Sequence, residues 1–480
     1  MFKGFHLLLV ALVLSLNASS LPVIINGKSA AGDAFVFRLY SQLDPISGAE
    51  KLVDQQRPDK NGDFMLGFEA NEIQQVSIHV GLQSIVLLVK PGETYRLNFN
   101  EITLKDQNVF LPQSPLRVLF EKEDLLNMVK DGFDYENQKF LESQFIKLIK
   151  YRDKRIYDRF EEEVDKMFSE TPFADSSEKE FLKSYIDYRL AELRLTSRIE
   201  SREKTGIEML TSEALQFHIP SYGQFFLKYF DQFFIEFQEG REYAHFKALL
   251  KKENSYSELM DVLGKDEVLV KEKLRETVLI LALKQVFFKV DFNKHEINTL
   301  LEYIANNSKY ESNRQIAYQV YNDLNTFLPG NSVPDFELKN LKGTNRKLSD
   351  FMGAKTYLMF VSPNCETCEA DIRILKSVKE TLGENFNILT VLAGFDSEES
   401  EEWAVNQKAN WDFLWFDNDF ALLNQYKVKT FPKYLLLDEK GQLLKYFPPK
   451  PRENLLGYLQ NLEKKEKPVE QESSDFFRKN

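Results

Sequence analysis

The two cysteines of this chain lie three residues apart, in the run Cys365-Glu366-Thr367-Cys368. Residues 356–361, just before them, are mostly apolar and predict a strand, and the periodicity after them predicts a helix. Cys365 is then expected at a helix N-terminus, where free backbone N–H groups and the helix dipole favour a thiolate. Cys368 follows by nearly one turn, close enough for the two sulfurs to close a small disulfide ring.

A cysteine pair at this spacing is suited to thiol–disulfide exchange, because one thiolate attacks and the other resolves the mixed disulfide. The motif alone leaves two other interpretations open, half of a metal site and a static disulfide. The chain has no third cysteine and no histidine after residue 332, so a zinc site within one chain would need carboxylate ligands. A structural disulfide would close a ring of only four residues and add little stability. Redox chemistry without a metal or an organic cofactor is therefore favoured.

The composition narrows the class of protein further. The 480 residues include 62 basic and 74 acidic side chains, which gives a formal net charge of −12. This balance argues against nucleic acid as a partner, because phosphate backbones need a concentrated basic surface. Two cysteines also exclude a disulfide-dense scaffold. At roughly 150 residues per domain, the length indicates about three domains.

The first twenty residues predict the compartment. Lys3 gives a short basic start, residues 7–16 form an apolar run, and residues 17–20 are small and polar. The pattern is typical of a secretory signal peptide over residues 1–20, with cleavage after Ser20, since a membrane span needs about twenty apolar residues. We expect export across the inner membrane to the periplasm. The alternative is an uncleaved N-terminal segment that anchors the chain to the membrane.

The rest of the chain divides into three regions and a tail. Residues 21–110 contain short apolar or alternating runs separated by turn dipeptides, which predicts a β-rich domain resembling a sandwich. Residues 115–328 show helical periodicity almost throughout and predict an all-α region, whose many phenylalanines indicate a core or, alternatively, a peptide-binding groove. A linker follows at 328–332, and residues 333–462 predict an α/β domain. Residues 464–480 are charge-rich and predict a disordered tail.

Several motifs of the last domain together resemble a known family. They are Val333-Pro334-Asp335-Phe336, residues 348–351, the strand–CxxC–helix unit, Thr430-Phe431-Pro432 and the turn sequence at 438–441. This order resembles the TlpA/ResA thiol-disulfide oxidoreductases of thioredoxin fold, with their helical insertion around 398–406. The β-rich region weakly resembles the leading domain of multidomain thioredoxin proteins from Bacteroidota.

The related AhpC/TSA peroxiredoxins are the competing family. Their peroxidatic cysteine normally follows a Pro-x-x-x-Thr-x-x-Cys segment. Here Pro363 precedes Cys365 by two residues and Thr367 comes after it, so the local spacing favours a disulfide oxidoreductase. Thiol peroxidase activity stays open as a weaker possibility.

The resemblance assigns roles to four residues. Cys365 is expected to attack the substrate disulfide and Cys368 to release the mixed disulfide. Pro432 is expected to be a cis proline facing the cysteines, so that the backbone of Phe431 can bind a substrate strand. These four positions are the predicted catalytic and substrate-binding residues.

The sequence departs from the family at three further positions. Asn364 replaces the tryptophan that usually precedes the first cysteine, and Met359 stands where thioredoxins often carry a buried acid. Lys433 follows the proline. These changes leave the redox potential and the choice of partner open.

Local charge bears on the direction of electron flow. Glu366, Glu369 and Asp371 lie in the first turns of the expected helix and oppose a thiolate at Cys365. We therefore expect the pKa of the Cys365 thiol to be only moderately lowered, which suits a reductase or an isomerase.

The sequence thus favours an exported thiol-disulfide oxidoreductase that acts on protein disulfides or thiols. A reductase outside the cytosol must be recharged, so a membrane thiol donor is an expected partner. The alternative is a binding module for envelope proteins or peptides in which the thioredoxin domain is vestigial.

Overall fold

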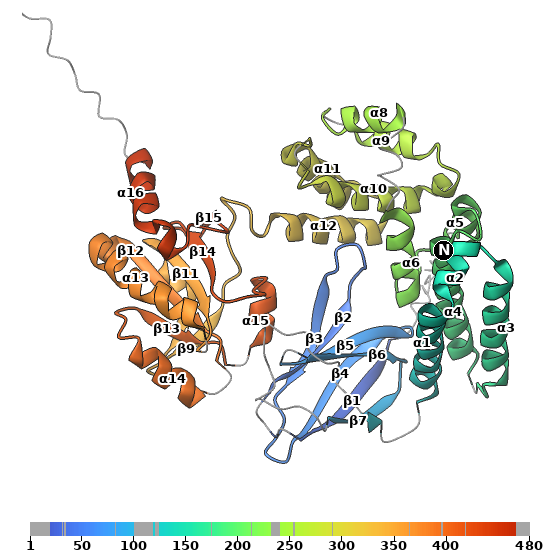
Figure 1. The fold of residues 1–480 in the computed structure, drawn as a ribbon, viewed down its shortest axis with the longest axis horizontal. Helices are drawn as coiled ribbons and strands as arrows, with labels where there is room; N and C mark the ends of the chain where they lie inside the picture. Colours follow the sequence, from blue (N-terminus) through green and yellow to red (C-terminus); the bar gives the residue numbers. More distant parts are fainter. Residues whose placement is uncertain are drawn as a thin grey trace, which may run out of the picture.

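The computed structural model describes residues 20–466, except for 31, 33–34, 82, 100–118, 121–123, 174, 213, 232–240, 253–254, 290, 364, 395–396 and 418. Figure 1 shows three parts in chain order: β-sheets, a group of helices and a mixed α/β domain. The predicted signal peptide lies outside the described residues, apart from Ser20. Within the part that the structure describes, no helix has the length and apolar character needed to cross a bilayer.

The first part contains two four-stranded sheets. One has the order β4-β1-β7-β8 and the other the order β3-β2-β5-β6. Their bounds are β1 Leu21–Ser29, β2 Phe37–Gln42, β3 Glu50–Gln56, β4 Asp63–Ala70, β5 Gln74–Val80, β6 Gln83–Val89, β7 Thr94–Phe99 and β8 Leu119–Phe120. Alternating apolar residues give each sheet one buried face. Phe37 of β2 stacks on Phe64 of β4 with ring centroids 4.0 Å apart, so side chains of both sheets meet in one core.

Strand β3 is the one strand of this part, among those before residue 100, that the sequence pattern does not indicate. Its residues are mostly polar, and none of them is buried. Two of its side chains bond across to the edge strand of the other sheet. Asp54 accepts from the Gly67 N–H at 2.8 Å, and Gln56 accepts from the Met65 N–H at 2.8 Å. Polar side chains here satisfy backbone groups that an edge strand would otherwise leave open.

The middle part consists of helices around one large apolar core. The helices are α1 Leu125–Ser143, α2 Phe145–Tyr151, α3 Lys154–Glu170, α4 Ser176–Ser197, α5 Arg202–Leu210, α6 Pro220–Asp231, α8 Arg241–Leu249, α9 Tyr256–Leu263, η1 Val268–Val270, α10 Glu272–Val286, α11 Lys294–Asn307 and α12 Glu311–Asn325. Helix N-termini are capped by Asp153, Asp175 and Ser201, whose side chains accept backbone N–H groups. Much of the phenylalanine-rich sequence forms core, including Phe225 and Phe226, as the periodicity predicts.

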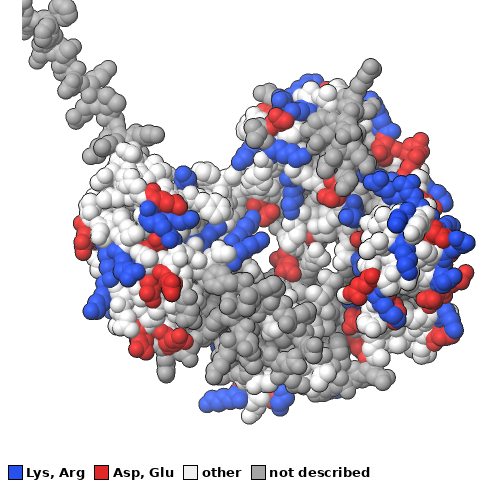
Figure 2. Space-filling view, viewed as in Figure 1, with Lys and Arg blue, Asp and Glu red and all other residues white. Residues whose placement is uncertain are grey.

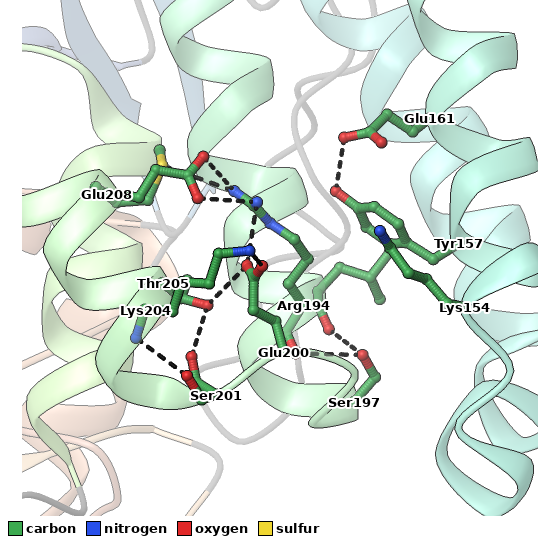
Figure 3. A network of polar contacts seen from close by, with 12 residues as sticks. Lys154, Tyr157, Glu161, Arg194, Ser197, Glu200, Ser201, Lys204, Thr205 and Glu208 are labelled. Atoms are coloured by element: carbon green, nitrogen blue, oxygen red, sulfur yellow. Dashed lines mark hydrogen bonds and ion pairs between the residues drawn. The ribbon is translucent and has the colours of Figure 1, made fainter.

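A partly buried arginine lies between three of these helices (Figure 3). Arg194 of α4 contacts Glu200 at 3.3 Å and Glu208 of α5 at 3.2 Å. Glu200 also pairs with Lys204, so carboxylates surround the guanidinium. On the other side of Arg194 lies Tyr157 of α3, and burial raises the pKa of this phenol. The network compensates for the desolvation of the charged Arg194.

The β2–β3 hairpin joins the first part to the second. Figure 1 shows this hairpin reaching the helices near α12. Ile46 at its tip belongs to the helical core, and the carbonyl oxygens of Ile46 and Ser47 accept from Lys284 Nζ of α10 at 2.8 and 3.0 Å. Lys284 lies 3.9 Å from Asp323 of α12. Asp323 also pairs with Lys427 of the last part at 3.1 Å, so one chain of polar contacts links all three parts.

Residues of the predicted linker at 328–332 form backbone hydrogen bonds with the last domain. The N–H of Gly330 donates to the Leu443 carbonyl at 2.7 Å, and the N–H of Leu443 donates to the Asn331 carbonyl at 2.8 Å. Phe327 stacks on Tyr446 with a centroid separation of 4.5 Å. These contacts fix the last domain against the end of α12.

The last part is a seven-stranded sheet of order β10-β9-β13-β12-β11-β14-β15 with helices on its faces. The elements are β9 Glu337–Asn340, β10 Asn345–Lys347, η2 Leu348–Phe351, β11 Lys355–Val361, α13 Glu366–Leu382, η3 Gly383–Asn385, β12 Phe386–Leu392, α14 Ser397–Asn406, β13 Asp412–Trp415, α15 Phe420–Gln425, β14 Lys433–Leu437, β15 Leu443–Lys445, η4 Pro451–Glu453 and α16 Leu455–Glu466. The fully buried strand β11 is parallel to β12 and antiparallel to β14.

Among the α-helices and strands of this domain, β9, β10, β13 and α15 have no counterpart in the sequence-based prediction. They are only three to six residues long, too short for a clear periodic signal. At the C-terminal end, α16 continues to Glu466, so residues 464–466 of the predicted disordered tail are helical. The remainder, residues 467–480, lies outside the described residues.

Candidate active site

The cysteine pair lies at the junction between β11 and α13. Cys365 is the N-cap residue of α13, and its Sγ accepts from the backbone N–H of Cys368 at 3.1 Å. The two cysteines form a disulfide, with their Cα atoms 5.2 Å apart. The predicted strand–CxxC–helix arrangement is therefore confirmed, and Cys365 lies where backbone N–H groups and the helix dipole stabilise negative charge.

The two sulfurs differ in their access to solvent. Cys365 is 9% exposed, whereas Cys368 is 0% exposed and packs in the apolar cluster that includes Met359 and Ile372. A thiol partner approaching from solvent thus reaches the residue Cys365 more easily than Cys368. In the disulfide form neither sulfur titrates, so the expected pKa of Cys365 applies to the reduced protein.

The proline predicted to face the cysteines begins the strand beside them. The Phe431–Pro432 peptide bond is cis, as predicted. Strand β14 follows at once and pairs with β11, the strand that leads to the cysteines. Phe431 is half-buried and packs against the cluster that contains Cys365 and Cys368. The fold therefore brings the four predicted site residues into one region, although they lie more than sixty positions apart in the chain.

A buried carboxylate lies one helical turn beyond Cys368. Asp371 is completely buried and accepts hydrogen bonds from the Tyr434 hydroxyl and from Arg452 Nη2, the latter at 3.1 Å. Its second oxygen, Oδ1, has no hydrogen-bond partner among the described residues. Burial and the Asp371 carboxylate both raise the pKa of Tyr434. Residues three apart on a helix are neighbours, so this carboxylate lies next to Cys368.

The structure revises the sequence-based prediction that Glu366, Glu369 and Asp371 all oppose a thiolate at Cys365. Asp371 is paired with Arg452, and Glu369 accepts from Trp403 Nε1 of α14 at 3.0 Å. Glu366 alone of the three acids is exposed. Tyr434 pairs with Met359 across the strands and donates a hydrogen bond to Asp371. Asp371 of α13 therefore places a buried acid in the region where β11 carries Met359. One signal in the sequence was its spacing, three residues after Cys368 on the apolar face.

Lys433 lies on the opposite face of the sheet. It pairs with Phe360 across the strands, whereas the next residue, Tyr434, pairs with Met359 on the cysteine side. Lys433 is 9% exposed, and its ammonium lies 3.9 Å from the ring centre of Tyr446 and 4.3 Å from that of Phe447. Burial lowers the pKa of Lys433 to about 8. The ammonium is thus held by aromatic faces in place of a carboxylate.

The described residues contain no group of three or more His, Cys, Asp or Glu side chains arranged to hold a metal ion. In this part of the chain the chemistry available near α13 is that of two sulfurs, a buried carboxylate and a phenol.

Comparison with known proteins finds relatives of the C-terminal domain. Residues 329–446 match the AhpC/TSA family. The chain is 27% identical over 133 residues to the thiol-disulfide oxidoreductase ResA of Geobacillus kaustophilus, which covers 27% of this chain and 76% of that protein. ResA of Geobacillus thermodenitrificans is 26% identical over 117 residues, 24% of this chain and 67% of that protein.

Among solved structures, the thioredoxin domain of a thiol-disulfide oxidoreductase from Bacteroides vulgatus is similar, at 20% identity and a TM-score of 0.26. The match covers 28% of this chain and 97% of that one.

The cysteine site and the sheet order define a thiol-disulfide oxidoreductase with a thioredoxin-like C-terminal domain. Within that class the domain is TlpA/ResA-like, which the AhpC/TSA match and the similarity to two ResA proteins support.

Proposed function

We propose that this protein is exported and exchanges protein disulfides through the Cys365–Cys368 pair, as a reductase or an isomerase. The observation that carries the proposal is the asymmetry of the pair, with Cys365 partly exposed at a helix N-terminus and Cys368 fully buried behind it. Among the described residues no cationic side chain bonds to Cys365 Sγ. A strong oxidase needs its reduced thiolate stabilised to a greater degree than a helix terminus alone provides.

The proposed reaction transfers electrons only between the sulfur atoms of the cysteine pair and those of the substrate disulfide. The Cys365 thiolate attacks one sulfur of the substrate disulfide, so a mixed disulfide forms and one substrate thiolate leaves and takes up a proton. Cys368 then loses its proton and attacks Cys365 Sγ, which forms the Cys365–Cys368 disulfide and releases the second substrate thiol. The dithiol is oxidised by two electrons and the substrate disulfide is reduced by two.

We propose that the Asp371 carboxylate accepts the proton that Cys368 loses. The carboxylate is buried beside Cys368, and its Oδ1 has no other partner among the described residues. A buried acceptor within reach of a thiol can take its proton as the sulfur attacks. Tyr434 and Arg452 hold the carboxylate by its other oxygen.

Phe431 and Pro432 form the proposed substrate-binding edge. The cis bond lies just before β14, and the half-buried Phe431 offers apolar surface beside the cysteines. An extended substrate segment would bind here through backbone hydrogen bonds to Phe431, which precedes β14 and lies outside the strand pairing of the sheet.

The recharging partner is proposed to be a membrane thiol donor that supplies two electrons to the Cys365–Cys368 disulfide. The N-terminal part, a β-sandwich in this proposal, and the helical part hold the redox domain in a fixed position. The contacts of Phe327 with Tyr446 and of Lys427 with Asp323 support that role.

Covalent trapping tests the proposal. Cys368→Ser leaves the mixed disulfide unresolved, so this variant should accumulate disulfide-linked partners, whereas Cys365→Ser should accumulate few. The measurement is non-reducing electrophoresis of each reduced variant after exposure to envelope proteins that contain disulfides. Equal trapping by both variants would contradict the assigned roles. Insulin reduction by the wild-type chain separates this function from a vestigial domain, which would give no turnover.

A further inference from the structure

Helix α2, far along the chain from the redox site, exposes apolar side chains to solvent. Ile146 is 77% exposed, Ile149 is 45% exposed and Tyr151 is 65% exposed. Large apolar side chains exposed together on one short helix are unusual at the surface of a soluble protein and mark interaction sites.

Basic side chains interleave with these apolar ones. Residues 145–155 contain five basic residues and one acidic residue, in a chain whose net charge is −12. Lys147, Lys150 and Arg152 form no ion pair with a carboxylate in the part of the chain that the structure describes. Lys150 instead lies over the ring of Tyr151, at 5.2 Å from its centroid. In Figure 2 basic side chains, interspersed with acidic ones, lie at the right, where Figure 1 places α2 and its neighbouring helices.

The inner side of α2 packs against the helical core. Leu148 is completely buried in the helical core, and Phe145 packs against that core one turn earlier. At the other end Arg152 takes a left-handed conformation with φ 50°, and its N–H donates to the Leu148 carbonyl at 2.8 Å. Asp153 then caps α3. Because the segment is already ordered, a partner that binds its outer side pays little conformational entropy.

We propose that the α2 surface, formed by Ile146, Lys147, Ile149, Lys150, Tyr151 and Arg152, docks on an anionic phospholipid bilayer. The isoleucines enter the boundary between headgroups and acyl chains, the tyrosine lies at the headgroup level, and the basic side chains contact lipid phosphates. Charge complementarity selects this occupant, because the local excess of positive charge is opposite to the charge of the whole chain. Figure 1 places the redox domain at the other end of the long axis, so docking through α2 leaves the disulfide uncovered.

Vesicle co-sedimentation tests the proposal. The protein is the chain from Leu21 to Asn480, which lacks the apolar run at 7–16 that would itself bind lipid. The probes are vesicles of phosphatidylethanolamine containing one-quarter phosphatidylglycerol, with pure phosphatidylcholine vesicles as the comparison. The expected result is binding to the anionic vesicles at least about tenfold tighter than to phosphatidylcholine, and weaker binding as salt rises.

Two variants identify the surface. Lys147→Glu/Lys150→Glu should weaken binding to anionic vesicles by at least about tenfold. Ile146→Ser/Ile149→Ser should weaken it by about threefold or more while the salt dependence persists. The control is Lys179→Glu/Lys342→Glu, which changes the net charge equally at two exposed lysines elsewhere and should bind as the wild type does. Circular dichroism confirms that each variant is folded.

Four outcomes overturn the proposal. The first two are no binding of the wild type to anionic vesicles at low salt and equal binding to both lipid compositions. The other two are equal loss in the α2 charge variant and its control, and binding that all variants retain, which would place the contact elsewhere on the chain.

Discussion

The hydroxyl of Tyr434 donates a hydrogen bond to the carboxylate of Asp371, which joins the strand after the cis proline to the helix that carries both cysteines. The two residues lie 63 positions apart in the chain. Both are buried, so the link joins the proposed substrate-binding region to the helix that carries the proposed resolving cysteine. A change at either residue should therefore affect the same step of the exchange reaction.

Asp371→Asn removes the proposed proton acceptor with little change in volume. We expect insulin reduction at neutral pH to fall by about tenfold, because Cys368 then attacks the mixed disulfide without a base beside it. The pH–rate profile should also shift, a change that a purely structural role would not produce. The control is Glu380→Gln, an exposed acid on the same helix, which should retain the wild-type rate and profile.

A rate and a pH profile for Asp371→Asn that match those of the wild type would show that the carboxylate serves only to hold Tyr434 and Arg452 in place.

Lys433→Met removes a buried ammonium. Burial lowers the pKa of Lys433 to about 8, below the ordinary lysine value of 10.5. Between these values the unfolded state binds more protons than the folded state, so this lysine makes stability rise with pH from about 8 to about 10.5. The methionine variant should be more stable than the wild type at pH 7, by about 1 kcal/mol after loss of the aromatic contacts.

The difference should shrink as the pH approaches 10.5, and urea denaturation at several pH values measures it. Lys445→Met, at an exposed lysine that lies over the ring of Tyr458, is the matched control and should show no such pH dependence. A Lys433 variant less stable than the wild type at every pH would mean that the contacts with Tyr446 and Phe447 outweigh the cost of burial.

The pKa of the Cys365 thiol in the reduced protein is expected to lie below the ordinary value of about 8.5 and above about 5. The helix N-terminus lowers the pKa, and the exposed Glu366 opposes this effect. The rate of iodoacetamide alkylation as a function of pH, in the Cys368→Ser variant, gives the value directly. A pKa below about 5 belongs to strongly oxidising pairs and would exclude the reductase or isomerase assignment.

What the sequence predicted correctly depended on local patterns. The alternation from apolar strand to cysteine motif to amphipathic helix lies within about thirty residues, so Cys365 could be placed at a helix N-terminus. The cis Phe431–Pro432 bond came from the family resemblance, and the structure confirms it. Both are features that neighbouring residues or a family motif specify.

What the sequence missed depended on contacts between distant segments. The partners of Asp371 could not be predicted, because Arg452 lies 81 residues later and Tyr434 lies 63 residues later in the chain. Strand β3 has no apolar alternation, because its polar side chains bond the edge of another sheet. The pairing of Lys427 with Asp323 likewise joins segments 104 residues apart, which no local pattern indicates.

Redox titration of the chain from Leu21 to Asn480 tests the central claim most directly. The protein is equilibrated with graded dithiothreitol or glutathione buffers, and its free thiols are counted by mass after alkylation. We predict that Cys365 and Cys368 become free together, in one two-electron transition between about −270 and −180 mV, the range from thioredoxin to protein disulfide isomerase. A pair that stays joined in the most reducing buffer, or that never joins in the most oxidising one, would contradict the account.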